Sequence, residues 1–148
     1  MYTLQDKKLM QAAIDCGKQC SSVESAYNVG AVIADANGTI ISTGYSRQLP
    51  GNTHAEQCAL LNLPDCQQLA HASMYTTMEP CSKRLSGNVP CVARILQSGI
   101  RRVLIGVREP PNFVDCTGAE ELQAKGVEVV YIAELEDECR ELNRHLTG

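Results

Sequence analysis

Three side chains that bind soft divalent metals lie in three separate parts of this chain, and they constrain its fold more than any other feature. His54 opens a His-Ala-Glu string, and Cys81 and Cys91 each follow a proline. One imidazole and two thiolates make three protein ligands for a catalytic zinc, which keeps its fourth position for water. The sequence therefore predicts a fold that brings these three segments together around one zinc ion.

Glu56, two residues after His54, is the predicted proton carrier of this site. Zinc lowers the pKa of a bound water from 15.7 to about 7, and a nearby carboxylate can collect and return the proton. Side chains two positions apart on a helix point about 200° away from each other, so Glu56 can reach that water only from near the helix end. A His-x-Glu string followed by Pro-Cys-x-x-Cys is typical of zinc-dependent base deaminases.

Nine residues separate the two cysteines here instead of two, so the segment between them must loop out and return. Its Gly87 is a turn former, and Pro90 suits a helix start. A helix predicted over 91–98, with Gly99 as its stop, places Cys91 at a helix N-terminus. The helix dipole favours a thiolate there.

Hydrophobic periodicity and turn residues predict an α/β domain. A capping box of Thr3 and Asp6 begins a first helix that is expected to reach about Cys20, and the turn Asn37-Gly38 supplies positive φ angles for a hairpin. Later apolar runs alternate with helices, as expected for parallel strands with crossover connections. We predict a central five-stranded mixed sheet with helices on both faces: strands at 29–34, 39–45, 73–77, 103–107 and 127–132, and further helices at 54–62, 91–98, 117–126 and 135–146.

With 148 residues and 44% hydrophobic content, the chain is expected to form a single domain, residues 1–148, around one core. It has no apolar run near the 18 or so residues of a membrane span and no signal-peptide core. We therefore expect a soluble cytoplasmic protein with no membrane partner, whose thiols stay reduced. Six cysteines are expected to be small, partly buried apolar residues: Cys16, Cys20, Cys58, Cys66, Cys116 and Cys139.

Six segments carry a resemblance to a known family: Val29-Gly30-Ala31-Val32-Ile33, Asn52-Thr53-His54-Ala55-Glu56, Thr77-Met78-Glu79-Pro80-Cys81-Ser82, Val89-Pro90-Cys91, Gly99-Ile100-Arg101-Arg102-Val103 and Gly126-Val127-Glu128-Val129. In these segments the chain resembles the pyrimidine deaminases of riboflavin biosynthesis, within the cytidine deaminase superfamily. The long spacing between the cysteines separates riboflavin-type enzymes from nucleoside and tRNA deaminases. Nine intervening residues instead of the bacterial eight, and Ala26-Tyr27-Asn28 where bacterial members carry Asn-Pro, favour the fungal-type branch, which acts on the reduced, ribitylamino compound.

The resemblance implies a three-layer α/β/α cytidine deaminase-like fold and a homodimer. It implies that His54, Cys81 and Cys91 bind Zn²⁺ and that Glu56 is the general acid and base. The implied reaction is hydrolytic deamination of 2,5-diamino-6-(ribitylamino or ribosylamino)-4(3H)-pyrimidinone 5′-phosphate in riboflavin biosynthesis.

Candidate contacts to that substrate lie beside the predicted zinc site. Cations suit its phosphate, since guanidinium clamps phosphate with two bonds and ammonium attracts it as a point charge. The candidates are Lys83, Arg84 and Arg47 for the phosphate, and Asn28, Asn52 and Ser82 for hydrogen bonds. Each could equally be a loop or turn residue. Arg101 and Arg102 are expected to be solvated surface charges.

Charge helps to choose among deaminases. The net charge is −4, and the chain has five Tyr, one Phe and no Trp, whereas a nucleic-acid editor needs a basic surface and aromatic rings for stacking. A small phosphorylated pyrimidine is therefore the expected partner, and nucleic acid is not. Two alternatives stay open. One is another small-molecule or tRNA deaminase, and the other is a structural zinc module closed by a fourth cysteine, Cys58 or Cys116.

Overall fold

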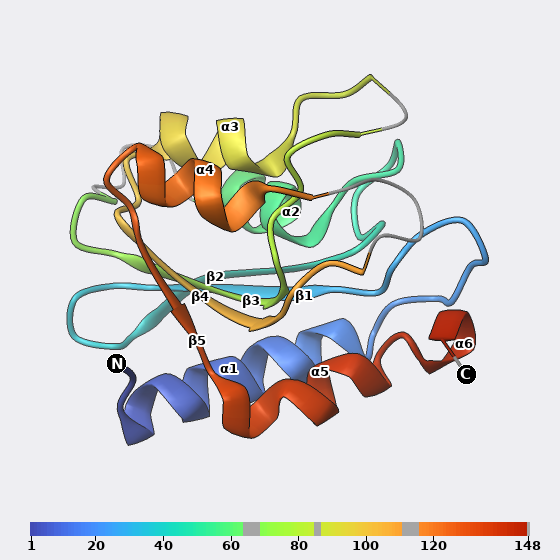
Figure 1. Ribbon diagram of the computed structural model, residues 1–148, viewed down its shortest axis with the longest axis horizontal. Helices are drawn as coiled ribbons and strands as arrows, with labels where there is room; N and C mark the ends of the chain where they lie inside the picture. The colour runs from blue at the N-terminus through green and yellow to red at the C-terminus, as the bar shows by residue number, and fades with distance from the viewer. Residues whose placement is uncertain (64–68, 85–86, 111–115, 148) are drawn as a thin grey trace.

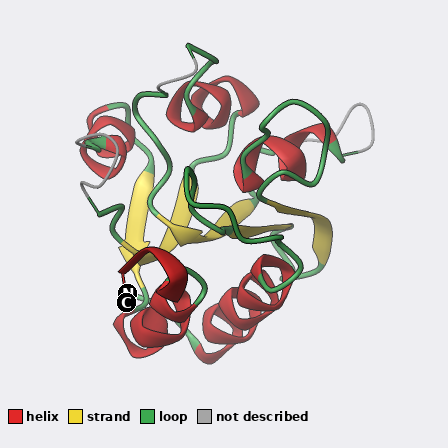
Figure 2. Ribbon diagram, turned by 90° about the vertical axis from the view of Figure 1, so that its right-hand side faces the viewer, coloured by secondary structure: helices red, strands yellow, loops and turns green. Residues whose placement is uncertain are grey.

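The computed structural model describes residues 1–63, 69–84, 87–110 and 116–147, and it shows a mixed sheet between two layers of helices (Figure 1, Figure 2). The five strands are β1 (Gly30–Ala34), β2 (Ile40–Tyr45), β3 (Ser73–Met78), β4 (Arg102–Val107) and β5 (Glu128–Tyr131). They lie in the order β2-β1-β3-β4-β5. β1 pairs antiparallel with β2 and β3, whereas β3, β4 and β5 are parallel. The predicted five-stranded mixed sheet is confirmed.

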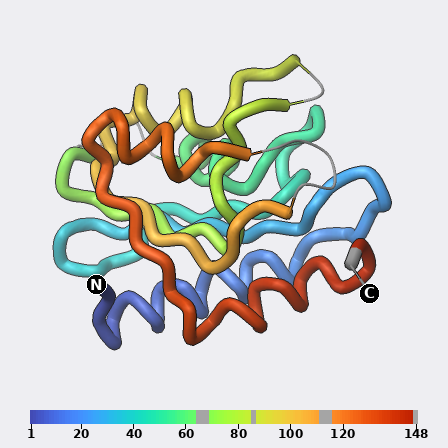
Figure 3. The backbone as a smooth tube through the Cα atoms, viewed as in Figure 1, coloured from blue at the N-terminus to red at the C-terminus, as the bar shows by residue number. Residues whose placement is uncertain are grey.

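Helices cover both faces of this sheet, which explains why its central strands are apolar on both sides. α1 (Leu4–Gly17) and α5 (Glu136–Glu141) lie on one face. The other face carries α2 (Ala55–Leu61), α3 (Cys91–Ser98) and α4 (Gly118–Ala124). β1 is buried at every position, as expected for a strand covered twice. Figure 3 shows the chain leave α4, run along the sheet as β5 and enter the opposite layer.

The hairpin between β1 and β2 forms where the Asn-Gly signal predicted it. Of its residues only Gly38 has a positive φ, 83°. The Asp35 carboxylate accepts the backbone N–H groups of Asn37 and Thr39 at 2.9 and 3.0 Å. The turn thus rests on an aspartate cap and one left-handed glycine, not on two left-handed residues.

The first helix begins with the predicted capping box. Thr3 Oγ1 accepts the Asp6 N–H at 3.1 Å, and Asp6 Oδ2 accepts the Thr3 N–H at 2.9 Å. The helix ends at Gly17, short of the predicted Cys20, because the backbone N–H groups of Gln19 and Cys20 bond to carbonyls three residues back, in a tighter turn. α1 also lies very close to β1. A Cβ on Gly30 would sit 1.8 Å from the Ala13 carbonyl oxygen, so only glycine fits there.

The C-terminal segment corrects the prediction of one helix over 135–146. A 3₁₀ turn (Ala133–Leu135) precedes α5, and a separate short helix, α6 (Arg144–Thr147), follows it. Asn143 lies at the break with its side chain buried. Its Oδ1 accepts the Asn28 N–H, and its Nδ2 donates to the Asn28 carbonyl at 2.9 Å. The chain turns here because this asparagine pairs with the backbone just ahead of β1.

Arg102 was expected to be a solvated charge, and that expectation is wrong. Its two terminal nitrogens donate to both oxygens of buried Asp6, at 3.1 and 2.9 Å. Tyr75 donates its hydroxyl to Asp6 Oδ1 at 2.6 Å. This cluster joins α1, β3 and β4. No described helix is both long and apolar enough to cross a membrane.

Candidate metal centre

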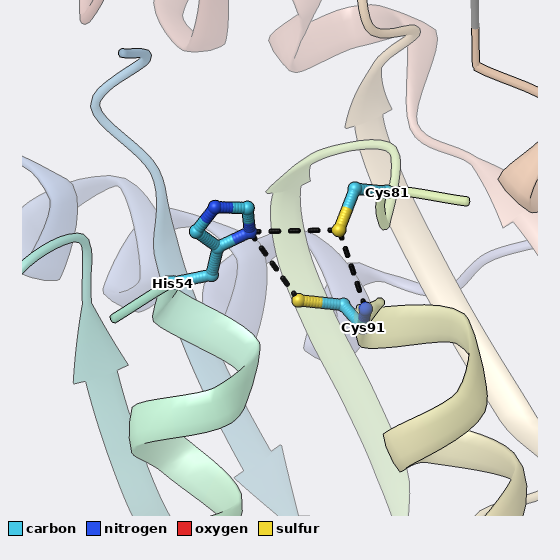
Figure 4. A group of neighbouring side chains, drawn as sticks. All are labelled: His54, Cys81 and Cys91. Carbon is cyan, nitrogen blue, oxygen red and sulfur yellow. Dashed lines mark hydrogen bonds between the residues drawn. The ribbon is translucent and has the colours of Figure 1, made fainter. Parts of the chain in front are cut away.

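The three predicted ligands converge at the carboxyl end of β3. His54 is the residue before α2, Cys91 is the first residue of α3, and Cys81 comes three residues after β3 ends (Figure 4). His54 Nδ1 lies 3.5 Å from Cys81 Sγ and 3.5 Å from Cys91 Sγ. The Cys91 N–H donates to Cys81 Sγ at 3.2 Å. The candidate ligand atoms all lie within 4.8 Å of one another.

These separations fit a tetrahedral zinc ion. With Zn–N near 2.05 Å and Zn–S near 2.3 Å, the nitrogen-to-sulfur edge of a tetrahedron is about 3.6 Å. The two observed separations are 3.5 Å. One imidazole and two thiolates also match the donor set of hydrolytic zinc sites. The cluster can hold a zinc ion with one position left for a fourth ligand.

The local environment prepares one thiol for ionisation. The hydrogen bond from the Cys91 thiol lowers the pKa of Cys81, and nearby His54 lowers it further. The same contact raises the pKa of Cys91, and burial adds to that rise. The contact between the two sulfurs therefore favours the thiolate form of Cys81.

Glu56 meets the geometric condition set from the sequence. His54 precedes α2 with an extended backbone (φ −90°, ψ 158°). The direction of its side chain is therefore not set by the regular rotation of side chains around the helix. Glu56 is the second residue of α2 and is 4% exposed. His54 and Glu56 line the same pocket. Burial, and secondarily the Cys81 charge, raises the pKa of Glu56 to about 8.

That pocket opens beside the metal cluster and carries both signs of charge. Two of the six predicted substrate contacts are cations from the inserted segment, Lys83 and Arg84, and both line it. Lys83 is exposed, and within the described ranges it has no hydrogen-bond or ion-pair partner. Arg84 is half-buried, and its guanidinium donates to three protein oxygens. Its Nε is buried without a partner in the described part of the chain.

Arg47 also lines the pocket, but its guanidinium is held by protein oxygens. Nη1 donates to the Tyr27 carbonyl at 3.1 Å, and Nη2 donates to the Ser21 carbonyl at 2.8 Å and to Asn28 Oδ1. Its backbone has a positive φ of 63°. The arginine thus fastens the segment before β1 to the pocket wall.

The three predicted hydrogen-bonding residues differ in position. Asn52 lines the pocket, with a φ of 55°. Asn28 is buried, does not line the pocket, and donates its amide to Ser22 Oγ and the Leu142 carbonyl. Ser82 is outside the pocket lining, and its Oγ accepts the Thr117 N–H at 3.0 Å.

Two acidic residues of the pocket lining were given no role from the sequence. Glu79 is buried, and its carboxylate accepts the N–H groups of Glu109 and Ala119 at 3.2 and 2.9 Å. Burial, then the charges of Cys81 and Glu79, raises the pKa of Glu109 to about 8. A signal existed for Glu109. It follows β4 at the same edge of the sheet where Cys81 follows β3, and ligands collect at that edge.

The candidates for a fourth, closing cysteine lie elsewhere. Among the described residues, the metal cluster contains His54, Cys81 and Cys91, and neither Cys58 nor Cys116. Cys116 instead donates to the Pro80 carbonyl at 3.3 Å. Cys58 and Cys139 are buried, Cys16 and Cys20 partly so, and all of these thiols are free. Cys66 lies outside the described residues.

Known proteins are similar to this chain in sequence and fold. A family model described as the zinc-binding region of cytidine and deoxycytidylate deaminases matches residues 3–107. The chain is 44% identical over 143 residues to the diaminohydroxyphosphoribosylamino-pyrimidine deaminase of Schizosaccharomyces pombe, an alignment that covers 94% of this chain and 35% of that protein. It is 33% identical to the riboflavin biosynthesis protein RibD of Actinobacillus pleuropneumoniae, covering 95% of this chain and 36% of RibD. The chain thus spans about a third of the length of these curated relatives.

A solved structure supports the same assignment. The crystal structure of Aspergillus oryzae Rib2 deaminase in complex with DARIPP, a C-terminal deletion mutant at pH 6.5, aligns with a TM-score of 0.80 and 31% identity. The alignment covers 93% of this chain and 89% of that one. This chain therefore belongs to the cytidine and deoxycytidylate deaminase family and, as the sequence resemblance predicted, to its riboflavin-biosynthesis branch.

Proposed function

We propose that this protein hydrolytically deaminates 2,5-diamino-6-(ribitylamino or ribosylamino)-4(3H)-pyrimidinone 5′-phosphate in riboflavin biosynthesis. The observation that carries the proposal is the convergence of His54, Cys81 and Cys91 beside a pocket that His54 and Cys81 line together with buried Glu56. Family membership and the printed names of the relatives support the substrate class.

In this proposal His54, Cys81 and Cys91 hold the zinc ion. When bound, the ion would act as a Lewis acid and would lower the pKa of a bound water to near neutral. Glu56 carries the protons. Its carboxylate takes a proton from the attacking water and passes it to a ring nitrogen. It then takes the second proton from the hydroxyl group of the hydrated ring carbon and passes it to the departing amine. Water and the amine-bearing carbon thus become a carbonyl and ammonia.

Lys83 is our candidate for the phosphate. It lines the pocket with an exposed ammonium group, which attracts phosphate as a point charge. Arg47 and Asn52 form other parts of the wall. Asn28, which lies outside the lining, supports this wall by accepting a hydrogen bond from Arg47, whereas Ser82 bonds to Thr117, which is also outside the lining.

Between the two sugar forms we favour the ribitylamino compound. The nine residues between Cys81 and Cys91, and the Ala26-Tyr27-Asn28 string, follow the fungal-type pattern. Two of the relatives described above are fungal proteins. The single domain over 1–148, the homodimer and the cytoplasmic location stay predictions.

Product analysis tests the proposal. The zinc-loaded protein is incubated with both pyrimidine phosphates at equal concentration, and substrate loss is followed by mass spectrometry together with ammonia release. Replacement of an amine by a carbonyl oxygen adds about one mass unit, and we expect it first in the ribitylamino compound, with equimolar ammonia. If neither compound changes while cytidine or deoxycytidylate is deaminated, the protein is another deaminase of the superfamily.

A further inference from the structure

One arginine contacts all three segments that carry the candidate zinc ligands. Arg84 lies three residues after Cys81. Its Nη2 donates to the Asn52 carbonyl at 2.7 Å, two residues before His54. Its Nη1 donates to the Val89 carbonyl at 3.3 Å, two residues before Cys91. The guanidinium therefore bridges the flanks of His54 and Cys91 from the loop of Cys81.

A third hydrogen bond of Arg84 reaches the backbone of a ligand through one intermediate atom. Arg84 Nη1 donates to Gln57 Oε1 at 3.0 Å, and the same oxygen accepts the His54 N–H at 3.3 Å. Gln57 thereby closes the first turn of α2 while Arg84 holds the glutamine in place. The orientation of His54 is thus coupled to the guanidinium.

The geometry of these bonds requires arginine. Three acceptors, two from the segment of His54 and one from the segment of Cys91, lie around two different nitrogens of one planar group. A lysine presents its donors from a single nitrogen at the end of a flexible stem and cannot match this fork. The neighbouring cation, Lys83, differs from Arg84. It lines the pocket, and it takes part neither in the three hydrogen bonds of Arg84 nor in the bond between His54 and Gln57.

We propose that Arg84 is a positioning residue of the zinc site, and that it fixes the three ligand-bearing segments in place before metal binds. Lys83, not Arg84, then serves the phosphate of the substrate. This inference rests on the proposed function only for the role of Lys83. The claim about Arg84 concerns metal affinity, which is measured without turnover.

Substitutions at two adjacent positions separate these roles. Arg84→Gln removes the fork, Arg84→Lys keeps the charge but not the fork, and Lys83→Gln is the matched control. Zinc affinity is measured by competition with a chromophoric chelator, and circular dichroism reports folding. Partners that orient metal ligands typically contribute 10- to 100-fold to affinity, so we expect both Arg84 variants to bind zinc about 10- to 100-fold more weakly. Lys83→Gln should bind zinc like the unmodified protein.

Kinetics with the pyrimidine phosphate give the second measurement. At saturating zinc, the Arg84 variants should recover most of their kcat, whereas Lys83→Gln should raise KM for the phosphorylated substrate and leave KM for its dephosphorylated form unchanged. Asp6→Asn, on the other side of the sheet, controls for loss of stability and should keep normal zinc affinity. Normal zinc affinity in both Arg84 variants, with a KM raised only for the phosphorylated substrate, would make Arg84 a phosphate clamp and overturn the inference. If the protein proves inactive on every pyrimidine, the zinc measurements still decide the role of Arg84.

Discussion

Replacing Asp6 by asparagine should destabilise the fold while leaving the zinc site intact. The Asp6 carboxylate is nearly buried and accepts four hydrogen bonds, from the Thr3 N–H, the Tyr75 hydroxyl and two nitrogens of Arg102. Breaking a buried ion pair by removing one partner costs about 3–5 kcal/mol. The Arg102 side chain is 27% exposed and can be partly solvated, so we expect the low end, about 3 kcal/mol in the free energy of unfolding.

The loss should depend on pH in a defined direction. Burial alone would raise the pKa of Asp6, but hydrogen bonds from Arg102, Tyr75 and Thr3 hold it well below its usual value. A carboxyl with a depressed folded-state pKa stabilises the protein above its unfolded pKa, about 3.9, and loses that contribution as pH falls toward the folded value. The stability gap between the two proteins should therefore be constant from pH 7 to about 5. Below about pH 4 it should shrink by up to about 1.4 kcal/mol per pH unit.

Urea unfolding followed by far-ultraviolet circular dichroism at several pH values measures this gap. Effects that both proteins share, including acid release of metal, cancel in the difference. In a thermal scan near neutral pH, a loss of about 3 kcal/mol corresponds to a Tm lower by roughly 6–12 °C for a chain of this size. An Asp6→Asn protein as stable as its parent at pH 7, or a gap that widens in acid, would refute this account of the cluster.

Other substitutions test the site and the packing. Glu56→Gln should retain zinc but lower kcat by about 10²–10⁴-fold, since it removes the proton carrier; metal content and turnover measured on one sample check both, and near-normal turnover would remove Glu56 from the mechanism. Cys91→Ser should lose most zinc affinity in the chelator competition while circular dichroism shows a folded chain, because a hydroxyl is a poor substitute for a thiolate; undiminished affinity would exclude Cys91 as a ligand. Gly30→Ala should cost about 3 kcal/mol or more in urea unfolding, because the added methyl would meet the Ala13 carbonyl at 1.8 Å; an unchanged midpoint would show that α1 can move away.

Local signals predicted most of the fold. The Thr3 and Asp6 capping box, the Asn37-Gly38 turn and Gly99 after α3 act through neighbouring backbone atoms, so the sequence shows them directly. The break at Asn143 could not be found this way. It depends on pairing with Asn28, 115 residues away in sequence, and the periodicity of neighbouring residues carries no information about such a distant contact.

The same division explains the candidate site. Spacing and residue type brought out His54, Cys81, Cys91 and Glu56, because zinc chemistry limits which residues can serve. Lys83 and Arg84 were found by their nearness to Cys81 in sequence, but sequence could not show that the Arg84 guanidinium donates to protein oxygens. That distinction depends on where Asn52, Gln57 and Val89 lie in the folded chain.

The start of α3 explains how nine residues can separate the two cysteines where related sites have two. Pro90 precedes α3, and the Cys91 N–H at the start of the helix donates to Cys81 Sγ at 3.2 Å. The helix start thus brings the second cysteine back to the first. A bond of this kind at a helix N-terminus also favours the thiolate form that zinc needs.

The most direct test of the account is the absorption spectrum of the cobalt-substituted protein, read for the number of thiolate ligands and for a solvent position. We predict a tetrahedral spectrum with charge-transfer intensity for two sulfurs, which falls to that of one sulfur in Cys81→Ser and shifts when a small anion replaces the water. Intensity for three sulfurs, or a spectrum that no added anion changes, would show a closed structural site and contradict the proposed catalysis.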